Sequence, residues 1–251
     1  EVLARERVPW VIIGKGSNLL VADAGYRGAV ITLGSEFSRF VVGEDGCTIT
    51  VGAGAILARL VNEALSRELT GLEFAVGIPG TVGGAISMNA GSRTEWIGSL
   101  VRDVVTYKPG EGIRHYSGEQ IAWGYRLCGL PHDEIVLEAT LELEQATKDD
   151  IRARMERALT RRRRTQPLGV PSCGSVFKNP PDRAVGAMIE ECGLKGFCQG
   201  GAEVSSVHAN FIVNKGAATA ADVEAVIRHV HAKVRETYGV ELQPEVKFLG
   251  F

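Results

Sequence analysis

Residues 76–85 read Val-Gly-Ile-Pro-Gly-Thr-Val-Gly-Gly-Ala, and Asn89-Ala90-Gly91 follows closely. Residues 77–84 thus combine glycine at four positions with a proline, between apolar flanks. Glycine is costly to order, so such a cluster marks backbone that must turn sharply or approach another group closely. We expect this segment to wrap a phosphate-rich ligand. A purely structural loop is the alternative interpretation.

The first glycine motif along the chain, Gly14-Lys15-Gly16-Ser17-Asn18, follows the apolar run at residues 11–13 and precedes another at residues 19–21, and residues 76–85 form the second glycine motif. The pattern predicts a strand, a tight turn and a second strand. The two glycines free the backbone to offer N–H groups to an anion, and the serine and asparagine add side-chain donors. The motif matches neither GxGxxG nor the Walker sequence, so an ordinary β-turn is an equal alternative.

Residues 171–180, Pro-Ser-Cys-Gly-Ser-Val-Phe-Lys-Asn-Pro, place a hydroxyl, a thiol, a cation and an amide in one loop. Ser175 is not a GxSxG nucleophile, because residue 177 is Phe, so it either donates a proton beside Lys178 or caps a turn. Arg126 either binds a carboxylate bidentately or stacks on its neighbouring tyrosine. Glu245 lies in an alternating C-terminal strand, and this pattern alone indicates a solvent-facing side chain.

Strand patterns dominate the first part of the chain and helical patterns the later part. Periodicity predicts strands near residues 30–33, 40–42, 48–51, 101–107, 113–116, 135–143, 210–214 and 245–249, with a hairpin turn at 43–46. It predicts helices near residues 56–67, 149–164, 184–192 and 219–238. We expect Asp149 or Asp150 to cap the helix at 149–164. Residues 166–181, rich in proline and glycine, are predicted to be a loop at a domain junction. Helices do not follow every strand, which favours an α+β fold over a doubly wound parallel sheet.

The charge balance, 28 Lys+Arg against 30 Asp+Glu in 251 residues, gives no argument for a nucleic-acid partner or an acidic membrane surface. The basic run at residues 161–164 is better explained as a partner for a helix dipole. No apolar run approaches the roughly 20 residues of a membrane span, and the charged start does not resemble a signal peptide. The five scattered cysteines lack metal-ligand spacing, which predicts a reducing cytoplasmic setting and no metal site.

The motifs GKGSN, GIPGTVGGA, GYR, PSCGSVFKNP, GGAEVSSVHANFIVN and PEVKFLG follow one another along essentially the whole chain. Their order and spacing resemble the UDP-N-acetylenolpyruvoylglucosamine reductase family. Each motif alone is weakly specific, whereas six in register are highly specific. The short spacing between residues 126 and 136 and the PSxGSxFKNP form resemble the shorter, type II branch.

The resemblance implies an α+β fold with an FAD-binding domain of the vanillyl-alcohol-oxidase (PCMH) type, built of two α+β subdomains, and a smaller α+β substrate-binding domain. We assign the FAD-binding domain to residues 1–145, a linking helix to residues 146–165 and the C-terminal substrate-binding domain to residues 166–251. The family's N-terminal βα segment, with its own FAD contact, is expected to be missing before Val11. The resemblance implies NADPH-dependent reduction of UDP-N-acetylglucosamine enolpyruvate, a small-molecule substrate, through FAD, in peptidoglycan precursor synthesis in the cytoplasm. The sequence does not fix the oligomeric state, and a monomer is favoured.

Carried over by motif, the resemblance implies that Ser175 is the general acid, with Arg126 and Glu245 as its catalytic companions. It implies FAD contacts from Gly14, Lys15, Gly16, Ser17, Asn18, Ile78, Pro79, Gly80, Thr81, Gly83, Gly84, Ala85, Asn89 and Gly91. It implies substrate contacts from Tyr125, Arg163, Lys178, Asn179 and His208. The alternatives are another FAD-dependent oxidoreductase of the same domain type, such as an alcohol or sugar oxidase, and a catalytically silent nucleotide-binding module.

Overall fold

The computed structural model describes residues 2–251, and its chain divides into two compact units. Unit 1 comprises Glu1–Gly16 and Gly28–Thr160, and unit 2 comprises Ser17–Arg27 and Arg161–Phe251. A short N-terminal segment therefore folds with the C-terminal part of the chain, while the residues on either side of it belong to unit 1. The assignment of a cofactor-binding and a substrate-binding domain stays a prediction.

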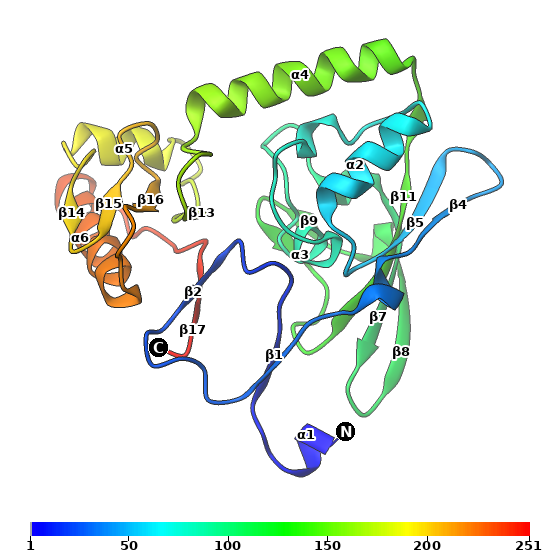
Figure 1. Cartoon of the computed structure of the whole chain (residues 1–251), viewed down its shortest axis with the longest axis horizontal. Helices are drawn as coiled ribbons and strands as arrows, with labels where there is room; N and C mark the ends of the chain where they lie inside the picture. Colours follow the sequence, from blue (N-terminus) through cyan, green and yellow to red (C-terminus); the bar gives the residue numbers. More distant parts are fainter. Residues whose placement is uncertain (1) are drawn as a thin grey trace. The chain divides into compact units, whose positions relative to one another are not determined.

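Unit 1 contains a five-stranded antiparallel sheet in the order β4-β5-β11-β7-β8 (Figure 1). Its strands are β1 (Trp10–Ile12), β3 (Ala29–Ile31), β4 (Phe40–Val42), β5 (Thr48–Gly52), β6 (Leu69–Thr70), β7 (Val101–Lys108), β8 (Gly112–Ser117), β9 (Trp123–Gly124), β10 (Leu127–Cys128), β11 (Ile135–Glu142) and β12 (Glu144–Gln145). Its helices are α1 (Val2–Arg5), α2 (Leu57–Ser66) and α3 (Val82–Ser87), and α4 (Lys148–Thr165) runs from unit 1 into unit 2. Short 3₁₀ helices are η1 (Ser35–Ser38), η2 (Glu73–Ala75), η3 (Ile97–Leu100) and η4 (Gly118–Gln120).

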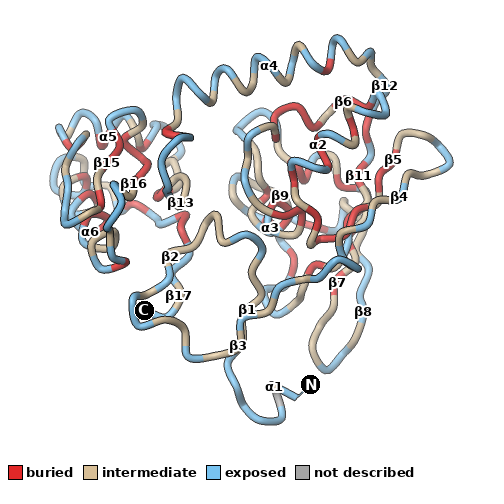
Figure 2. Tube along the Cα trace, viewed as in Figure 1, coloured by how far each residue is buried: buried red, intermediate tan, exposed pale blue. Residues whose placement is uncertain are grey.

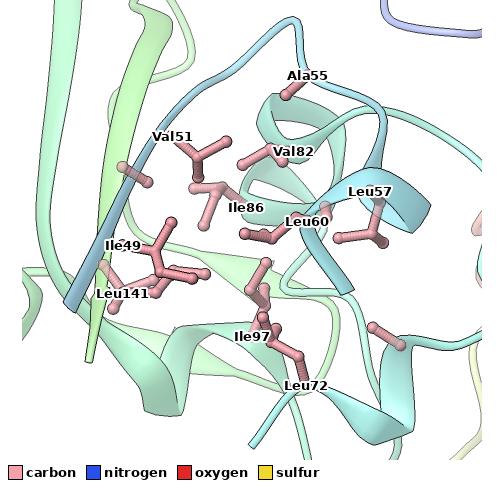
Figure 3. Packing of buried hydrophobic residues seen from close by; sticks show 14 of the residues in the cluster. Ile49, Val51, Ala55, Leu57, Leu60, Leu72, Val82, Ile86, Ile97 and Leu141 are labelled. Carbon is pink, nitrogen blue, oxygen red and sulfur yellow. The ribbon is translucent and has the colours of Figure 1, made fainter. Parts of the chain in front are cut away.

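The core of unit 1 forms where the sheet meets α2 and α3, and Figure 2 shows buried residues along these elements. Helix α2 buries Leu57, Leu60, Val61 and Ala64, the spacing of one helical face, which confirms the predicted helix at residues 56–67. Figure 3 shows the packing through labelled side chains of β5, β11, α2 and α3: Ile49, Val51, Leu141, Leu57, Leu60, Val82 and Ile86. Val82, Ala85 and Ile86 of α3 are part of this core, which positions the second glycine motif at the start of the helix.

Local signals in unit 1 predicted the long strands and helices correctly, missed α3 and predicted one cap wrongly. The hairpin of β4 and β5 turns at residues 43–46, with the Gly46 amide bonded to the Gly43 carbonyl, as predicted. Helix α4 was expected to begin at Asp149 or Asp150, but the hydroxyl of Thr147 accepts the Asp150 amide hydrogen (3.2 Å) and supplies the cap. The two aspartates lie in the first turn instead, where their charge favours the helix dipole.

Unit 2 contains a four-stranded antiparallel sheet in the order β13-β16-β15-β14. Its strands are β2 (Leu19–Val21), β13 (Ser172–Ser175), β14 (Cys198–Gln199), β15 (Ala202–Val204), β16 (Phe211–Asn214) and β17 (Lys247–Leu249), and its helices are α5 (Val185–Glu191) and α6 (Ala220–Tyr238). Strand β2 pairs in parallel with β17, in the register Leu19 to Lys247. The carboxylate of Asp23 accepts the amide hydrogens of Ala220 (2.8 Å) and Ala221 (3.0 Å), which fastens the N-terminal segment of unit 2 to the start of α6.

Strand β13 lies inside the stretch that the sequence predicted to be a loop. It pairs with β16 through Ser172 with Val213 and Ser175 with Phe211, and the register shifts between these pairs. Gly174 sits in this irregular part with a φ of 78°, a left-handed conformation that glycine adopts without strain. The prediction of a loop was wrong for residues 172–175, because pairing with a buried strand overrode the turn-forming composition there. Within residues 2–251, no helix has both the length and the apolar character needed to cross a bilayer.

Candidate functional site

The two glycine-rich motifs of unit 1 are in direct contact. A Cβ atom on Gly14 would lie only 2.4 Å from the hydroxyl oxygen of Thr81, so no larger residue fits there without moving Thr81. Thr81 is the N-cap of α3, and its hydroxyl accepts the Gly84 amide hydrogen at 3.4 Å. A Cβ atom on Gly84 would lie 3.6 Å from the same hydroxyl. Gly14 and Gly84, both exposed, therefore border one threonine.

Not every glycine of the second motif faces this surface. The Gly83 amide donates to the Ala53 carbonyl (2.8 Å), and a Cβ atom on Gly83 would lie 2.9 Å from the Ala53 side chain. The Val82 amide donates to the Ala55 carbonyl (2.9 Å). Close packing of α3 on residues 53–55 is thus sufficient reason for glycine at position 83, and the side chain of Ala85 is buried in the core.

The exposed part of the two motifs fits the pyrophosphate of FAD. Gly14 and Gly84 are exposed and carry no Cβ atom of their own, although Thr81 borders both of them, and Lys15 adds an exposed cation next to Gly14. Backbone amides and a cation without intervening Cβ atoms are the groups that bind phosphate oxygens. The remaining predicted FAD contacts, Ile78, Pro79 and Gly80, lie in the loop that leads into Thr81, where Gly80 has a φ of 126°. Their contacts with FAD stay predictions.

Asn89 and Gly91 hold the turn that carries Arg126. The Asn89 amide nitrogen donates to the Gly124 carbonyl (2.8 Å), and its oxygen accepts the Gly98 amide hydrogen (3.0 Å). The guanidinium of Arg126 donates to the Gly91 carbonyl at 3.0 Å. Asn89 is 3% exposed, so its side chain is part of the scaffold of unit 1. Their predicted FAD contacts stay predictions, but the hydrogen bonds give these residues a positioning role.

Arg126 itself occupies a constrained position between β9 and β10. Its φ is 54°, which is uncommon for a residue with a side chain. Its guanidinium carbon lies 5.2 Å from the centre of the Tyr125 ring, and that of Arg93 lies 6.0 Å from the same ring. Tyr125 is 39% exposed. A guanidinium fixed by a carbonyl and an aromatic face is oriented before any carboxylate binds.

In unit 2, Ser17 lies near Gly174, and Asn18 lies beside Glu245. The Asn18 amide nitrogen donates to the Glu245 carbonyl (3.0 Å), and the Asn18 carbonyl accepts the Lys247 amide hydrogen (3.0 Å). A Cβ atom on Gly174 would lie 4.0 Å from the Ser17 carbonyl. The first glycine motif is therefore divided: Gly14, Lys15 and Gly16 belong to unit 1, whereas Ser17 and Asn18 belong to unit 2.

Ser175 and Glu245 lie on neighbouring chain segments of unit 2. The Glu245 amide donates to the carbonyl of Val176, the residue after Ser175, at 2.7 Å, and Phe177 pairs with Pro244. Ser175 is half-buried and Glu245 is 8% exposed. The expectation that Glu245 faces solvent was wrong, because this residue precedes β17 and is enclosed by the Ser175 segment.

His208 is a neutral imidazole with a defined tautomer. Its Nδ1 accepts the Asn210 amide hydrogen (3.2 Å), so the ring proton lies on Nε2. Burial lowers the pKa of His208 below its ordinary value near 6.5, which leaves the ring uncharged at pH 7. Its edge contacts the Phe211 ring, with centroids 4.9 Å apart. His208 can therefore offer one N–H donor to a ligand without adding charge.

The remaining predicted substrate residues belong to different elements. Lys178 is half-buried, and its amide donates to the Gln243 carbonyl (2.9 Å). The side-chain oxygen of Asn179 accepts the Val185 amide hydrogen (2.9 Å), which caps α5. Arg163 is exposed in the last turn of α4. Arg126 and Tyr125 belong to unit 1, and Ser175, Glu245, Lys178, Asn179 and His208 belong to unit 2.

Comparisons with known proteins bear on the whole chain. The family model described as "FAD binding domain" matches residues 1–108, and the model described as "UDP-N-acetylenolpyruvoylglucosamine reductase, C-terminal domain" matches residues 166–249. The curated UDP-N-acetylenolpyruvoylglucosamine reductase of Heliobacterium modesticaldum is 46% identical over 97% of this chain and 77% of its own length. The chain belongs to the UDP-N-acetylenolpyruvoylglucosamine reductase family.

Further members of the reductase family agree. The enzyme of that name from Bacillus subtilis is 41% identical over 100% of this chain and 82% of its own length. The solved structure of UDP-N-acetylenolpyruvylglucosamine reductase from Thermus caldophilus matches with a TM-score of 0.86 and 37% identity, over 99% of this chain and 88% of that one. The resemblance seen in the motifs and the α+β fold with an FAD-binding domain are thereby confirmed.

Sequence reasoning missed one buried polar residue of this reductase fold, Asn210. It stands between His208 and β16 and is 4% exposed. Its sequence signals are a place in the GGAEVSSVHANFIVN motif and a position at the start of a predicted apolar strand, and neither of them predicts a role. Its hydrogen bonds become visible only in the folded chain.

Replacing Gly14 with alanine is expected to weaken FAD binding by the reductase at least about tenfold. The new Cβ would overlap the Thr81 hydroxyl and displace the cap of α3. The measurement is titration of the flavin-free protein with FAD, followed by flavin fluorescence. Gly34→Ala is the matched control, because a Cβ there meets no atom within 4 Å. Equal FAD affinity of Gly14→Ala and the control would remove this turn from the FAD site.

Proposed function

We propose that the protein reduces UDP-N-acetylglucosamine enolpyruvate to UDP-N-acetylmuramate, with NADPH as reductant and FAD as bound cofactor, in peptidoglycan precursor synthesis. The similarity to reductases over nearly the whole chain supports the substrate and the reaction. The observation that carries the residue assignment is the 2.7 Å hydrogen bond from the Glu245 amide to the Val176 carbonyl, which places Glu245 beside the Ser175 segment.

FAD, reduced by NADPH, supplies the hydride for the methylene carbon of the enolpyruvyl ether. The chain's own residues then act on the carboxylate and on the adjacent carbon. Arg126 binds the substrate carboxylate with its planar guanidinium and stabilises the negative charge that develops there. Because the Gly91 carbonyl and the Tyr125 ring already orient this guanidinium, little order has to be created on binding.

Ser175 donates its hydroxyl proton to the carbon that bears the carboxylate, which completes the lactyl ether. A serine hydroxyl is a weak acid, so a neighbouring cation or proton relay must support it. Lys178, on the same segment, is the candidate cation. Glu245, buried and held against this segment, completes the set as a hydrogen-bonding companion of the acid. Solvent restores the serine proton after each turnover.

The nucleotide part of the substrate carries a diphosphate, and the other predicted residues suit it chemically. The neutral His208 offers its Nε2 proton, Lys178 and Arg163 offer positive charge, and Asn179 and Tyr125 offer polar groups. All five cysteines are free thiols, as is usual for a reducing compartment. We propose that the enzyme works in the cytoplasm as a monomer on this small-molecule substrate.

Anaerobic spectroscopy tests the proposed reaction. The purified, flavin-loaded protein should lose its flavin absorbance when NADPH is added and regain it when the enolpyruvyl sugar nucleotide follows. Mass spectrometry should then find one UDP-N-acetylmuramate for each NADPH consumed. Rapid reoxidation by oxygen without response to the sugar nucleotide would instead indicate an oxidase of the same domain type. A protein that binds no flavin would indicate a silent nucleotide-binding module.

A further inference from the structure

Asn210 is a buried polar residue in an apolar part of unit 2. It is 4% exposed, and the neighbouring segment contains Val176 and Phe177, which are each 1% exposed. A polar side chain is retained at such a place when it satisfies other buried polar groups. The buried polar groups that Asn210 satisfies therefore indicate its role.

The side-chain amide of Asn210 forms two hydrogen bonds with the backbone of one residue in the Ser175 segment, Phe177. Its oxygen accepts the Phe177 amide hydrogen (3.0 Å), and its nitrogen donates to the Phe177 carbonyl (2.8 Å). The Asn210 backbone carbonyl also accepts the Val176 amide hydrogen (2.9 Å). Strand pairing with β16 ends at Ser175, opposite Phe211. The asparagine side chain thus extends the hydrogen bonding to Phe177, two residues beyond the last pair of β13 and β16.

The other edge of the same segment holds Glu245. The Val176 carbonyl accepts the Glu245 amide hydrogen (2.7 Å), and the Lys178 amide donates to the Gln243 carbonyl (2.9 Å). The segment from Ser175 to Lys178 consequently lies between Asn210 on one side and residues 243–245 on the other. A shift of Phe177 would disturb the segment that joins Ser175 to Lys178 and that carries the backbone partner of Glu245.

We infer that Asn210 is a positioning residue for proton transfer: its two hydrogen bonds to Phe177 fix Ser175 relative to Glu245. The inference rests on the proposed role of Ser175. Without the Asn210 side chain, the buried amide and carbonyl of Phe177 lose these bonds, and the segment must move to regain partners. A displacement of about 1 Å in a reacting group is enough to slow a reaction about 100-fold.

The test compares Asn210→Ala with Asn214→Ala in the flavin-loaded enzyme. Asn214 also accepts two backbone amide hydrogens, from Gly216 (2.7 Å) and Ala218 (3.1 Å), but these belong to the loop before α6. We expect Asn210→Ala to slow flavin reoxidation by the substrate about 100-fold, with flavin reduction by NADPH within about threefold of wild type. Asn214→Ala should leave both half-reactions within about threefold of wild type.

Asn210→Ser is the second variant, because a shorter hydroxyl can make at most one of the two bonds and preserves some polarity in the buried site. We expect it to slow reoxidation by an intermediate factor, and it carries the test if the alanine variant does not fold. Equal reoxidation rates for wild type and the folded Asn210 variants would overturn the inference. Equal losses in both half-reactions would also overturn it, because they indicate a general structural defect.

A double-mutant comparison separates this inference from the proposed function. If Asn210 acts through Ser175, then adding Asn210→Ala to Ser175→Ala should slow reoxidation less than about threefold further. A full additional 100-fold loss would show that Asn210 acts elsewhere and would overturn the inference alone. If Ser175→Ala by itself has no effect on reoxidation, the proposed role of the serine fails instead.

Discussion

Replacing Ser175 with alanine is expected to slow reduction of the enolpyruvyl substrate by about 10³-fold or more, while NADPH still reduces the flavin. General acid catalysis contributes about 10² to 10⁴ in rate, and alanine removes the proton that this step requires. The hydroxyl is half-buried at the end of β13, where it contributes no part of the core. The variant should therefore keep its fold and its cofactor.

The measurement is anaerobic stopped-flow absorbance, which follows flavin reduction by NADPH and reoxidation by the sugar nucleotide separately. Ser172→Ala is the matched control, because Ser172 lies exposed on the same strand, where its hydroxyl accepts a long hydrogen bond from the Gly174 amide (3.4 Å). Both half-reactions of the control should match wild type. If Ser175→Ala lost both half-reactions, or neither, the serine would not be the proton donor.

Helices and strands with a clear hydrophobic periodicity were predictable, because the residues that they bury lie on one face and repeat at the spacing of a helix or a strand. Helix α2 and strand β11 each bury residues at the spacing of their own geometry. Helix α6 also carried a readable start, since Thr219 and Asp222 form a capping box, and a readable end, since Gly239 is left-handed with a φ of 68°. In these cases the local sequence and the tertiary environment favour the same structure.

Strand partners were not predictable, because alternation identifies a strand without specifying its neighbour. Strands β1 and β2 are separated only by the first glycine motif, yet β1 pairs with β3 and β2 pairs with β17. Both pairings are parallel and join segments far apart in the chain. Residues Ser17–Arg27 belong to unit 2 because of these long-range pairings and because Asp23 accepts hydrogen bonds from the start of α6.

The sequence identified candidate residues of the site more readily than it identified the role of each residue. Glycine at position 83 suggested ligand contact, but close packing on Ala53 explains it. Asn89 suggested a polar contact with the cofactor, but both ends of its amide bond the backbone of unit 1. Glu245 looked solvent-facing and is buried. In each case the neighbours of the residue are set by folding and cannot be read from the local sequence, so its predicted role in the site stays a prediction.

Replacing Arg126 with methionine is expected to lower kcat/KM for the enolpyruvyl substrate by about 10³-fold. Methionine has a similar length but no charge and no donors, so neither the bound carboxylate nor the charge developing on it is stabilised. Arginine and methionine both carry a Cβ atom, so a φ of 54° strains the backbone equally in the wild type and in the variant. A difference in backbone strain therefore does not contribute to the expected loss. Flavin reduction by NADPH should remain close to wild type, since this half-reaction does not involve the substrate carboxylate.

Lysine at position 126 separates charge from geometry. It keeps the positive charge but has no planar fork, so it cannot bind the Gly91 carbonyl and a carboxylate in the way that the guanidinium does. We expect a loss in kcat/KM between that of methionine and wild type, about 10- to 100-fold. Arg93→Met is the control, because the guanidinium of Arg93 also lies over the Tyr125 ring, at 6.0 Å. Equal losses for Arg93→Met and Arg126→Met would attribute the effect to the shared aromatic contact, and the role of Arg126 as the carboxylate clamp would then be wrong.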